Sequence, residues 1–397
     1  MASSDLSQDD ILGENYYPPG YKPEPLHIIL VLSDVLGRIH PLKLVFVWVA
    51  LAAIACWPWG DLRLPAAAMS LAFTIIDGSG LALLPRQRRS FGPVTPPLLA
   101  LASIHTVLTL AVGLVWGTRA GLMLATALSA AVSGSFLYAT WIEPFQLSVT
   151  DARLRSAKLN GRTSLRLLHI TDIHVERTTA REEKLLQLVE ELNPDVIVLT
   201  GDYLNLAYVY DPQAQADAHA LLARLCDITR GPIYAITGSP PVDRTDVVPQ
   251  IFDGLPIVWL LDEVTEARIN GHTIRIAGVR CTREREQDAP RLRHLLQTSL
   301  THEFTLLLYH SPDLMPEAVD LGIDLYLCGH THGGQIRLPI FGALITSSAF
   351  WKQYEMGRYV EGDTTLYVSR GLGMEGFGAP RARFLAPPEI VLWTLSS

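Results

Sequence analysis

Cysteine is scarce in this chain, and its cysteines are too scattered to share a role. Cys56, Cys226, Cys281 and Cys328 show neither a paired spacing nor the close spacing of a metal site. Cys56 lies in an apolar run and Cys328 lies in a buried type of strand. A disulfide framework is therefore not expected. The cysteines are predicted to be reduced structural thiols, which favours a cytosolic environment for the second half of the chain.

Charge is scarce as well. Only 18% of the 397 residues are charged, and the formal net charge of −8 argues against a nucleic-acid-binding protein. The charges are sparsest before about residue 142, whereas the rest of the chain has the composition of an ordinary globular domain. The length of the chain and this uneven distribution together predict two domains.

Four long apolar segments account for the sparsely charged first part. Three of them have the roughly 20 residues needed to cross a hydrocarbon core of about 30 Å, and the first is at the short limit. Aromatic residues stand at several segment ends, as they do at membrane interfaces. We predict a four-span transmembrane bundle over residues 42–141, preceded by an N-terminal segment 1–41, in preference to buried core helices. The segments are Leu42–Trp57, Leu64–Leu84, Pro97–Trp116 and Ala120–Trp141.

Lysine and arginine residues near the segment ends predict an orientation. Eight of them fall on one side of the predicted membrane and two on the other, and the richer side is normally cytoplasmic. The sequence therefore predicts a multi-pass protein of the inner or cell membrane with its second domain in the cytoplasm; a miscount of one span would reverse this. The richer side carries Arg38, Lys43, Arg86, Arg88, Arg89, Arg153, Arg155 and Lys158, and the other side carries Arg63 and Arg119.

Two ionisable residues, Asp77 and His105, fall inside the apolar segments. Intramembrane ionisable residues are functional candidates by default. Here Gly-Ser-Gly follows Asp77 near a segment end, where water can reach it, and His105 can pair with Asp77 or with a backbone carbonyl. We expect a structural role for both, in preference to transport or proton relay.

Five hydrophobic runs in the second half end at polar residues, and four of them end at metal-ligand types. Residues just past the carboxyl ends of strands in an α/β sheet converge on one crevice, and divalent metals bind carboxylates and imidazoles there. Each motif alone is common in turns, but the ordered set predicts a metal cluster. The fifth run, Ile233–Thr237, leads to Ser239, which is not a strong ligand. The other runs are Leu165–Thr171 before Asp172 and His174, Val196–Thr200 before Asp202, Phe304–Tyr309 before His310, and Ile323–Cys328 before His330 and His332.

The order of these motifs resembles the calcineurin-like metallophosphoesterases. The strings GHTHGGQIRLP from Gly329, YVSRGLG from Tyr367 and PPEIVLWTL near the end are similar to the bacterial, membrane-tethered branch of that family. The string GHTHGGQ is specific, whereas Asp-x-His alone is not. The resemblance covers roughly residues 146–397, which we take as a metallophosphoesterase-like domain.

The resemblance implies a binuclear centre of two divalent metal ions, whether Mn, Fe, Zn or Mg. It implies that Asp172, His174 and His332 bind one metal and that His310 and His330 bind the other. It also implies that Asp202 bridges the two metals. Adjacent cations acidify a water molecule and neutralise charge on a phosphoryl group, so Asp202 and His330 are the expected catalytic residues.

The chain departs from the family pattern after its third run. The family has Gly-Asn-His where this chain has Gly238-Ser239-Pro240. The Asn is normally a ligand of the second metal, and the His normally contacts the phosphoryl group and helps the leaving group to depart. Ser239 offers only a weaker hydroxyl ligand, and Pro240 has neither a polar side-chain atom nor an N–H group. Another group, such as Asp243 or Arg244, would have to replace the His.

The pattern of elements predicts the fold. Phe145–Arg155 alternates in the manner of a strand, and Arg181–Leu192 reads as an amphipathic crossover helix between parallel strands. Later strands at Thr273–Val279, Thr364–Val368 and Glu389–Leu395 suggest a second sheet packed on the first. The expected fold class is an N-terminal all-α transmembrane bundle followed by an α/β domain, a two-sheet α/β sandwich of metallophosphoesterase type.

The leading interpretation is a membrane-bound two-metal phosphoesterase that hydrolyses a phosphomonoester or phosphodiester. The bundle and its short link to the domain favour a lipid-linked substrate, with the lipid bilayer as a partner and no nucleic acid. The alternative is a degenerate, non-catalytic relative that binds metal or a partner protein, and a regulated transporter is a third reading. Arg337, Arg370 and Arg381 are either phosphate contacts or ordinary surface charges.

Overall fold

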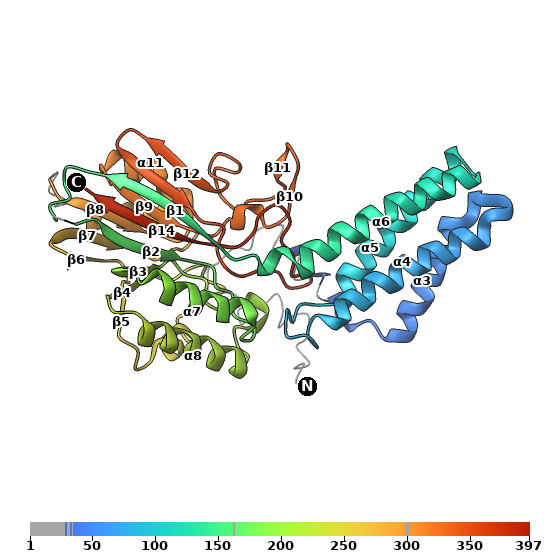
Figure 1. Ribbon diagram of the computed structural model, residues 1–397, viewed down its shortest axis with the longest axis horizontal. Coiled ribbons are helices and arrows are strands. Elements are labelled where there is room, and N and C mark those ends of the chain that lie inside the picture. The colour runs from blue at the N-terminus through green and yellow to red at the C-terminus, as the bar shows by residue number, and fades with distance from the viewer. Residues whose placement is uncertain (1–27, 30–31, 34, 162, 298–301) are drawn as a thin grey trace. The chain divides into compact units, whose positions relative to one another are not determined.

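The computed structural model describes residues 28–29, 32–33, 35–161, 163–297 and 302–397 (Figure 1). Packing divides the chain into two units. One contains Glu143–Glu375 and Arg383–Ser397, and the other contains Lys22–Ile142 together with Gly376–Ala382. Most of the predicted N-terminal segment 1–41 lies outside the described residues.

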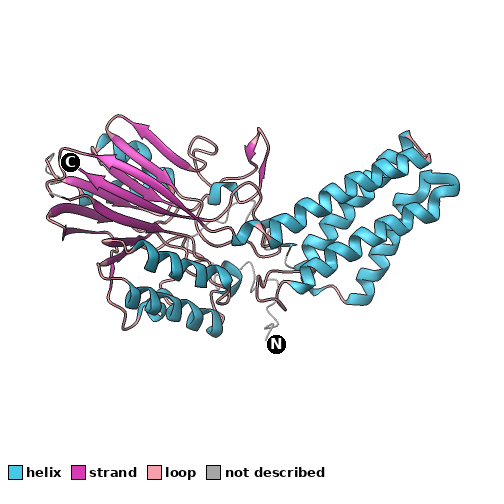
Figure 2. Cartoon of the chain, viewed as in Figure 1, coloured by secondary structure: helices cyan, strands magenta, loops and turns pink. Residues whose placement is uncertain are grey.

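The second of these units is helical, as the apolar segments predict (Figure 2). The side chains of His40 and Thr118 cap the first and last long helices, and proline begins the first and third. The helix interfaces are rich in Ala, Ser, Thr and Gly, which lets helices approach closely. The helices are α3 (Pro41–Cys56), α4 (Arg63–Leu83), α5 (Thr95–Val115) and α6 (Arg119–Trp141), with short 3-10 turns η1 (Leu36–Arg38) and η2 (Trp57–Leu62).

The number of membrane spans depends on α3. Among the described residues, three stretches are long and apolar enough to cross a membrane, namely Pro41–Leu83, Thr95–Val115 and Arg119–Phe145. The first contains both α3 and α4, which pack against each other on either side of a kink where Gly60 has φ +52°. At 1.5 Å per residue, α3 is only about 24 Å long. The helical bundle is therefore confirmed, and its four-span count stays a prediction.

Asp77 and His105 pair inside this bundle. His105 Nε2 lies 2.9 Å from Asp77 Oδ2, and neither residue is exposed. The hydroxyl of Ser133 on α6 lies 3.4 Å from the same nitrogen. These contacts join α4, α5 and α6, which favours the predicted structural role. Asp77 is fully buried, so the prediction that water can reach it is wrong.

The other unit contains two mixed six-stranded sheets (Figure 2). The first sheet has the order β1–β14–β2–β3–β4–β5, and its strands run parallel except for β14 against β2. The second has the order β12–β13–β9–β8–β7–β6, with antiparallel pairs only at its two edges. The first sheet comprises β1 (Ser148–Arg155), β2 (Leu165–Ile170), β3 (Val196–Leu199), β4 (Ile233–Ala235), β5 (Ile257–Trp259) and β14 (Glu389–Ser396); the second comprises β6 (Glu263–Ile269), β7 (His272–Gly278), β8 (Phe304–Leu308), β9 (Leu325–Cys328), β12 (Gly357–Glu361) and β13 (Thr364–Val368).

The core lies between the two sheets. Leu167 and Val198 of the first sheet belong to the same buried cluster as Leu306 and Leu327 of the second. Helices cover the outer faces, so the central strands are buried on both sides. The covering helices are α7 (Ala180–Leu192), α8 (Pro212–Ile228), α9 (Val248–Phe252), α10 (Arg285–Leu295) and α11 (Met315–Asp320), with 3-10 turns η3 (Glu143–Phe145), η4 (Leu206–Tyr208), η5 (Pro312–Leu314) and η6 (His332–Gly334).

The predicted two-sheet α/β sandwich is thus confirmed, with one error of assignment. The sequence predicts that Glu389–Leu395 joins the second sheet, but β14 lies in the first, between β1 and β2. The prediction is wrong because the partners of β14 are far away in sequence and leave no local signal. A separate two-stranded hairpin, β10 (Arg337–Leu338) with β11 (Gly342–Ala343), stands apart from both sheets (Figure 1).

Candidate metal centre

Six carboxylate and imidazole side chains gather where four strands end. Asp172 and His174 follow β2 and Asp202 follows β3 in the first sheet. His310 follows β8 in the second sheet, and His330 and His332 follow β9. All six are buried. The candidate ligands follow successive hydrophobic runs in the sequence. In the fold they come from both sheets, at the carboxyl ends of their strands.

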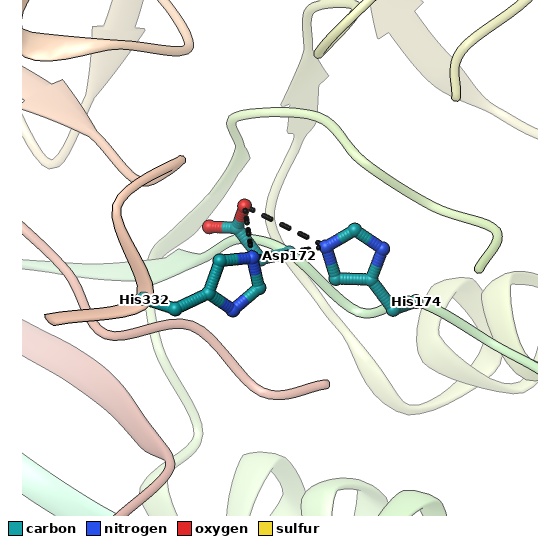
Figure 3. Close-up of side chains that lie close together, drawn as sticks. All are labelled: Asp172, His174 and His332. Atoms are coloured by element: carbon teal, nitrogen blue, oxygen red, sulfur yellow. Dashed lines mark hydrogen bonds and ion pairs between the residues drawn. The ribbon is translucent and has the colours of Figure 1, made fainter. Parts of the chain in front are cut away.

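Asp172, His174 and His332 form the first triad (Figure 3). The Nε2 atoms of His174 and His332 lie 3.2 Å apart, and they are 3.9 Å and 3.6 Å from Asp172 Oδ1. One ligand atom from each residue lies within 4.8 Å of the others. Three such donors converging on one point could hold a metal ion.

Asp202, His310 and His330 form the second triad. Asp202 Oδ2 lies 3.2 Å from His310 Nε2, and it is also 3.7 Å from His174 Nε2 in the first triad. A single carboxylate oxygen therefore lies within reach of both triads. This is the position that a bridging ligand requires.

The backbone at these residues is unusual. Five of the six have positive φ: Asp172, His174, Asp202, His330 and His332, at +47° to +71°. Few non-glycine residues adopt this conformation, and it typically costs about 1–3 kcal/mol at each strained position. Strain concentrated at one cluster of polar side chains indicates a site whose geometry is imposed for a purpose other than stability.

Glycines allow these backbones to approach one another. A Cβ atom at position 329 would lie 1.9 Å from Asp172 Oδ2, and one at position 238 would lie 2.1 Å from Asp202 Oδ1. Neither carboxylate could keep its place beside a larger residue. Gly329 and Gly238 are therefore required by close packing against the two triads.

Hydrogen bonds orient three of the four imidazoles. His310 Nδ1 lies 2.7 Å from the Thr200 carbonyl oxygen, and His330 Nε2 lies 3.0 Å from that of Ser347. His174 Nδ1 lies 2.8 Å from Glu375 Oε2 and 3.1 Å from the Leu204 carbonyl oxygen. An acceptor on the outer nitrogen leaves the inner nitrogen with its lone pair, as metal-binding histidines need.

Burial and neighbouring charges shift the pKa values of these side chains in different directions. Burial acts to lower the pKa of both His174 and His310, but neighbouring carboxylates outweigh it and raise each pKa to about 9. Burial lowers the pKa of His330 and His332 well below the usual value. Burial would raise the pKa of Asp202, but His310 and other imidazoles lower it below its usual value. Burial also raises the pKa of Asp172. Because imidazoles bind metals in their deprotonated form, divalent cations binding here would displace protons from His174 and His310.

Ser239 lies at the second triad. Its Oγ is 3.2 Å from His310 Nε2, 3.3 Å from Asp202 Oδ2 and 3.4 Å from His330 Nδ1, and its backbone N–H donates to Asp202 Oδ1 at 2.6 Å. The hydroxyl therefore occupies the place expected of a ligand from this strand end. Pro240 brings no polar side-chain atom to the site.

Asp243 holds the loop around Ser239 instead of facing the triads. Its buried carboxylate accepts hydrogen bonds from the backbone N–H groups of Gly238, Asp202 and Tyr203 at 2.6 to 3.0 Å. Burial, reinforced by the charge of Asp202, raises the pKa of Asp243 to about 7. Arg244 pairs with Asp246 at 3.2 Å. Both groups suggested as substitutes for the missing His are thus engaged in other contacts.

Asp243→Asn is expected to destabilise the protein by about 1–3 kcal/mol, because an amide NH₂ would face backbone N–H donors that then lack an acceptor. The measurement is thermal unfolding of the full chain in detergent. Asp246→Asn is the matched control, since its carboxylate is exposed and its partners are the side chains of Arg244 and Tyr210, with no backbone N–H donor to leave unpaired. Equal melting temperatures for the two variants would contradict this role for Asp243.

The three arginines considered for phosphate contacts have protein partners. Arg370 pairs with Glu389 at 2.8 Å, and Arg337 pairs with Glu355 at 2.8 Å. Arg381 donates to backbone carbonyls, among them that of Gly376. A phosphate contact by any of them stays a prediction.

Three functional candidates escape sequence reasoning: Glu375, Arg383 and Arg283. Glu375 contacts His174, and Arg383 lies 3.4 Å from His332 Nδ1 while it donates to the carbonyls of Arg370, Gly371, Gly373 and Ala386. Arg283 donates to the Ser347 carbonyl oxygen, which also accepts from His330. None follows a hydrophobic run, so only the fold shows their proximity to the triads.

Two carboxylates and four imidazoles, sharing one carboxylate between two triads, suit a pair of divalent ions such as Mn, Fe or Zn. An α/β sandwich with these donors at its strand ends has the arrangement of a candidate binuclear metal centre. The family model for calcineurin-like phosphoesterases matches residues 165–334, which include all six side chains. This chain belongs to the calcineurin-like phosphoesterase family.

Three relatives each match about two thirds of the chain. The uncharacterized metallophosphoesterase YkuE of Bacillus subtilis is 30% identical over 285 residues, which are 70% of this chain and 94% of the relative. The phosphodiesterase YaeI of Escherichia coli is 27% identical over 64% of this chain and 92% of its own. The UDP-2,3-diacylglucosamine pyrophosphatase LpxG of Chlamydia trachomatis is 26% identical over 67% and 94%, respectively.

Proposed function

We propose that this protein is a membrane-bound, two-metal phosphoesterase that hydrolyses a phosphomonoester or phosphodiester. The observation that carries the proposal is the pair of buried triads with Asp202 Oδ2 between them. Six buried donors, five of them in strained backbone conformations, are difficult to explain in a protein that needs no metal. The names of two relatives, a phosphodiesterase and a pyrophosphatase of a lipid-linked nucleotide, support the reaction class and a lipid-linked substrate.

The residues divide between two metal ions. Asp172, His174 and His332 would hold one ion, His310 and His330 would hold the other, and Asp202 would bridge them. Ser239 would add a weak hydroxyl ligand to the second ion. When bound, such a pair acidifies a water molecule and neutralises developing charge on a phosphoryl group. The protein itself fixes the donors through the carbonyls of Thr200 and Ser347.

The leaving group receives little help from the chain. Pro240 replaces the family's histidine, and Asp243 is occupied by three backbone N–H groups. A general acid typically contributes about 10²–10⁴-fold to the rate. Slow turnover is therefore expected, together with a preference for substrates that have acidic leaving groups.

The same loop favours one alternative, a relative that binds metal or a partner without catalysis. One experiment separates the two: metal analysis of the purified full chain, and turnover of an aryl phosphodiester with and without added manganese. The proposal expects bound divalent metal and turnover that depends on it. Bound metal without turnover of acidic-leaving-group esters would leave only the non-catalytic alternative.

We further propose that the protein is an integral, multi-pass membrane protein with its phosphoesterase domain in the cytoplasm. In a bacterial host, a C-terminal alkaline phosphatase fusion is expected to be inactive and a C-terminal fluorescent fusion active. Arg86→Gln, Arg88→Gln and Arg89→Gln together should weaken this preference, because they remove three of the eight charges on the predicted inner side. Strong alkaline phosphatase activity from the unaltered fusion would refute the orientation.

A further inference from the structure

An uncharged segment of the phosphoesterase domain exposes large apolar side chains. Residues 338–351, LPIFGALITSSAFW, contain no Asp, Glu, Lys or Arg, and we call them the apolar hairpin because they include the β10–β11 turn. Ile340 at its tip is fully exposed, and Phe341 and Trp351 are 56% and 61% exposed. The other exposed apolar members are Leu338, Leu344 and Ile345.

These side chains belong to one surface. The Lys352 ammonium lies 3.6 Å from the centre of the Phe341 ring and donates to the Phe341 carbonyl oxygen. The Thr346 hydroxyl donates to the Trp351 carbonyl oxygen at 2.8 Å. The β10–β11 turn and the following residues are therefore adjacent to residues 351–352. A contiguous apolar surface on a domain otherwise of ordinary composition marks a binding surface.

The composition of this surface fits a lipid bilayer. Its basic neighbours Arg337 and Lys352 flank the uncharged residues, and Trp351 and Phe341 are the residue types that occupy the interface between headgroups and acyl chains. Arg337 and Lys352 share one acidic partner, Glu355, so together they keep a net positive charge that complements anionic headgroups. Only residues 142–147 separate α6, a candidate membrane span, from β1. Such a short connection would keep the phosphoesterase domain near the bilayer that α6 crosses.

The base of the hairpin is attached to the metal-ligand segment. The Ser347 carbonyl oxygen accepts from His330 Nε2 at 3.0 Å, and Arg337 donates to the Gly333 carbonyl oxygen at 2.6 Å. The Thr331 hydroxyl donates to the Glu355 carbonyl oxygen at 2.7 Å, and Glu355 pairs with Arg337. A surface held by the hairpin is thus held in a defined position relative to His330 and His332.

We propose that the apolar hairpin inserts into the interfacial layer of the bilayer and so presents the metal centre to phosphoesters in lipid headgroups. Insertion stands on the exposed side chains, their basic flanks and the short link to α6. The presentation of lipid headgroups rests in addition on the proposed function.

Insertion is tested on the full chain in lipid nanodiscs. Cys56 and Cys226 are replaced by serine, Ile340→Cys is labelled with an environment-sensitive fluorophore, and quenching by lipids with a doxyl group on the acyl chain is measured. Cys281 and Cys328 are buried and can stay. Val360→Cys on β12 and Val258→Cys on β5 are controls, since both valines are exposed on edge strands. Quenching at position 340 should exceed that of both controls about twofold or more, as for a side chain buried among acyl chains.

Two results would overturn insertion. One is quenching at position 340 no stronger than at the controls. The other is disulfide or crosslinker capture of position 340 by position 340 of a second copy, which would make the hairpin an interface between chains. Neither readout depends on catalysis, so insertion can stand even if the proposed function fails.

Presentation is tested with Ile340→Ser plus Phe341→Ser. Turnover of phosphoesters in lipid vesicles should fall about 10-fold or more, because two apolar anchors are lost. Turnover of a soluble aryl phosphodiester, metal content and melting temperature should stay unchanged, since both side chains are exposed. An equal loss on both substrates would overturn presentation. Quenching at position 340 together with no turnover of any ester would support insertion and overturn the proposed function.

Discussion

Asp202→Ala is expected to empty both metal sites and to lower turnover by more than about 10³-fold, beyond what a single electrostatic group supplies. The reason is the position of one oxygen, Oδ2, which lies 3.2 Å from His310 and 3.7 Å from His174. Removing a bridge deprives two ions at once. The measurements are metal stoichiometry of the purified protein and turnover of an aryl phosphodiester.

Two further variants make this result specific. His332→Ala should mainly empty the first triad, because His332 has no short contact with His310 or His330 among the described residues. Asp202→Asn keeps an oxygen that can accept from the Ser239 N–H, so it separates loss of the loop contact from loss of a bridging charge. Far-UV circular dichroism should be unchanged in all three variants. Normal metal stoichiometry in Asp202→Ala would rule out the bridging role.

Ser239→Asn combined with Pro240→His is expected to strengthen binding of the second metal and to raise turnover by as much as about 10²–10⁴-fold, the usual contribution of a general acid. Ser239 Oγ already lies 3.2 to 3.4 Å from Asp202, His310 and His330, so an amide oxygen introduced there starts from a ligand position. Amide oxygen is a stronger ligand than a hydroxyl. The imidazole supplies the proton donor that Pro240 cannot.

Single variants separate the two contributions. Ser239→Asn alone should raise metal affinity more than it raises the rate, whereas Ser239→Ala should lower occupancy of the second site. The gain from Pro240→His should be largest for substrates with poor leaving groups, which need a proton most. If the double variant stays folded while metal affinity and turnover remain flat, the loop has been rebuilt for another purpose and is not a weakened form of the family's site.

The structure brings together the six residues that the sequence singles out, and most of them stand next to strong local signals. A hydrophobic run predicts a buried strand. Asp172 and His310 come directly after such runs, and Asp202 follows one after a single glycine. The helix α7 is equally local: Thr179 and Glu182 form a capping box, and Asn193 ends the helix in a left-handed conformation. Helix propensity, hydrophobic pattern and capping residues agree in this segment. The observed helix, Ala180–Leu192, therefore matches the predicted Arg181–Leu192 to within one residue.

What the sequence does not reveal depends on contacts between distant segments. Glu375 and Arg383 lie in a loop without periodicity, yet they reach His174 and His332 through 2.8 Å and 3.4 Å contacts. The prediction for β14 is wrong for the same reason. This strand pairs antiparallel with β2, and the two strands are far apart in the sequence. Thr150 of β1 and Glu389 of β14, for example, are 239 residues apart in the sequence. No local hydrophobic pattern encodes so distant a partner.

The place of β14 has a consequence for how the chain is made. The strand β1 is at the edge of its sheet, and among the described residues it pairs with β14 alone. Thr150 therefore cannot meet Glu389 until that residue has been translated, 239 residues later. Helix α6 leaves the ribosome before β1, so if α6 spans a membrane as proposed, its insertion precedes completion of the first sheet. During that interval β1 presents an unpaired edge, the kind of edge on which chaperones and misfolded neighbours act. Biogenesis of this protein should therefore be sensitive to truncation after Glu389, which removes nearly all of β14.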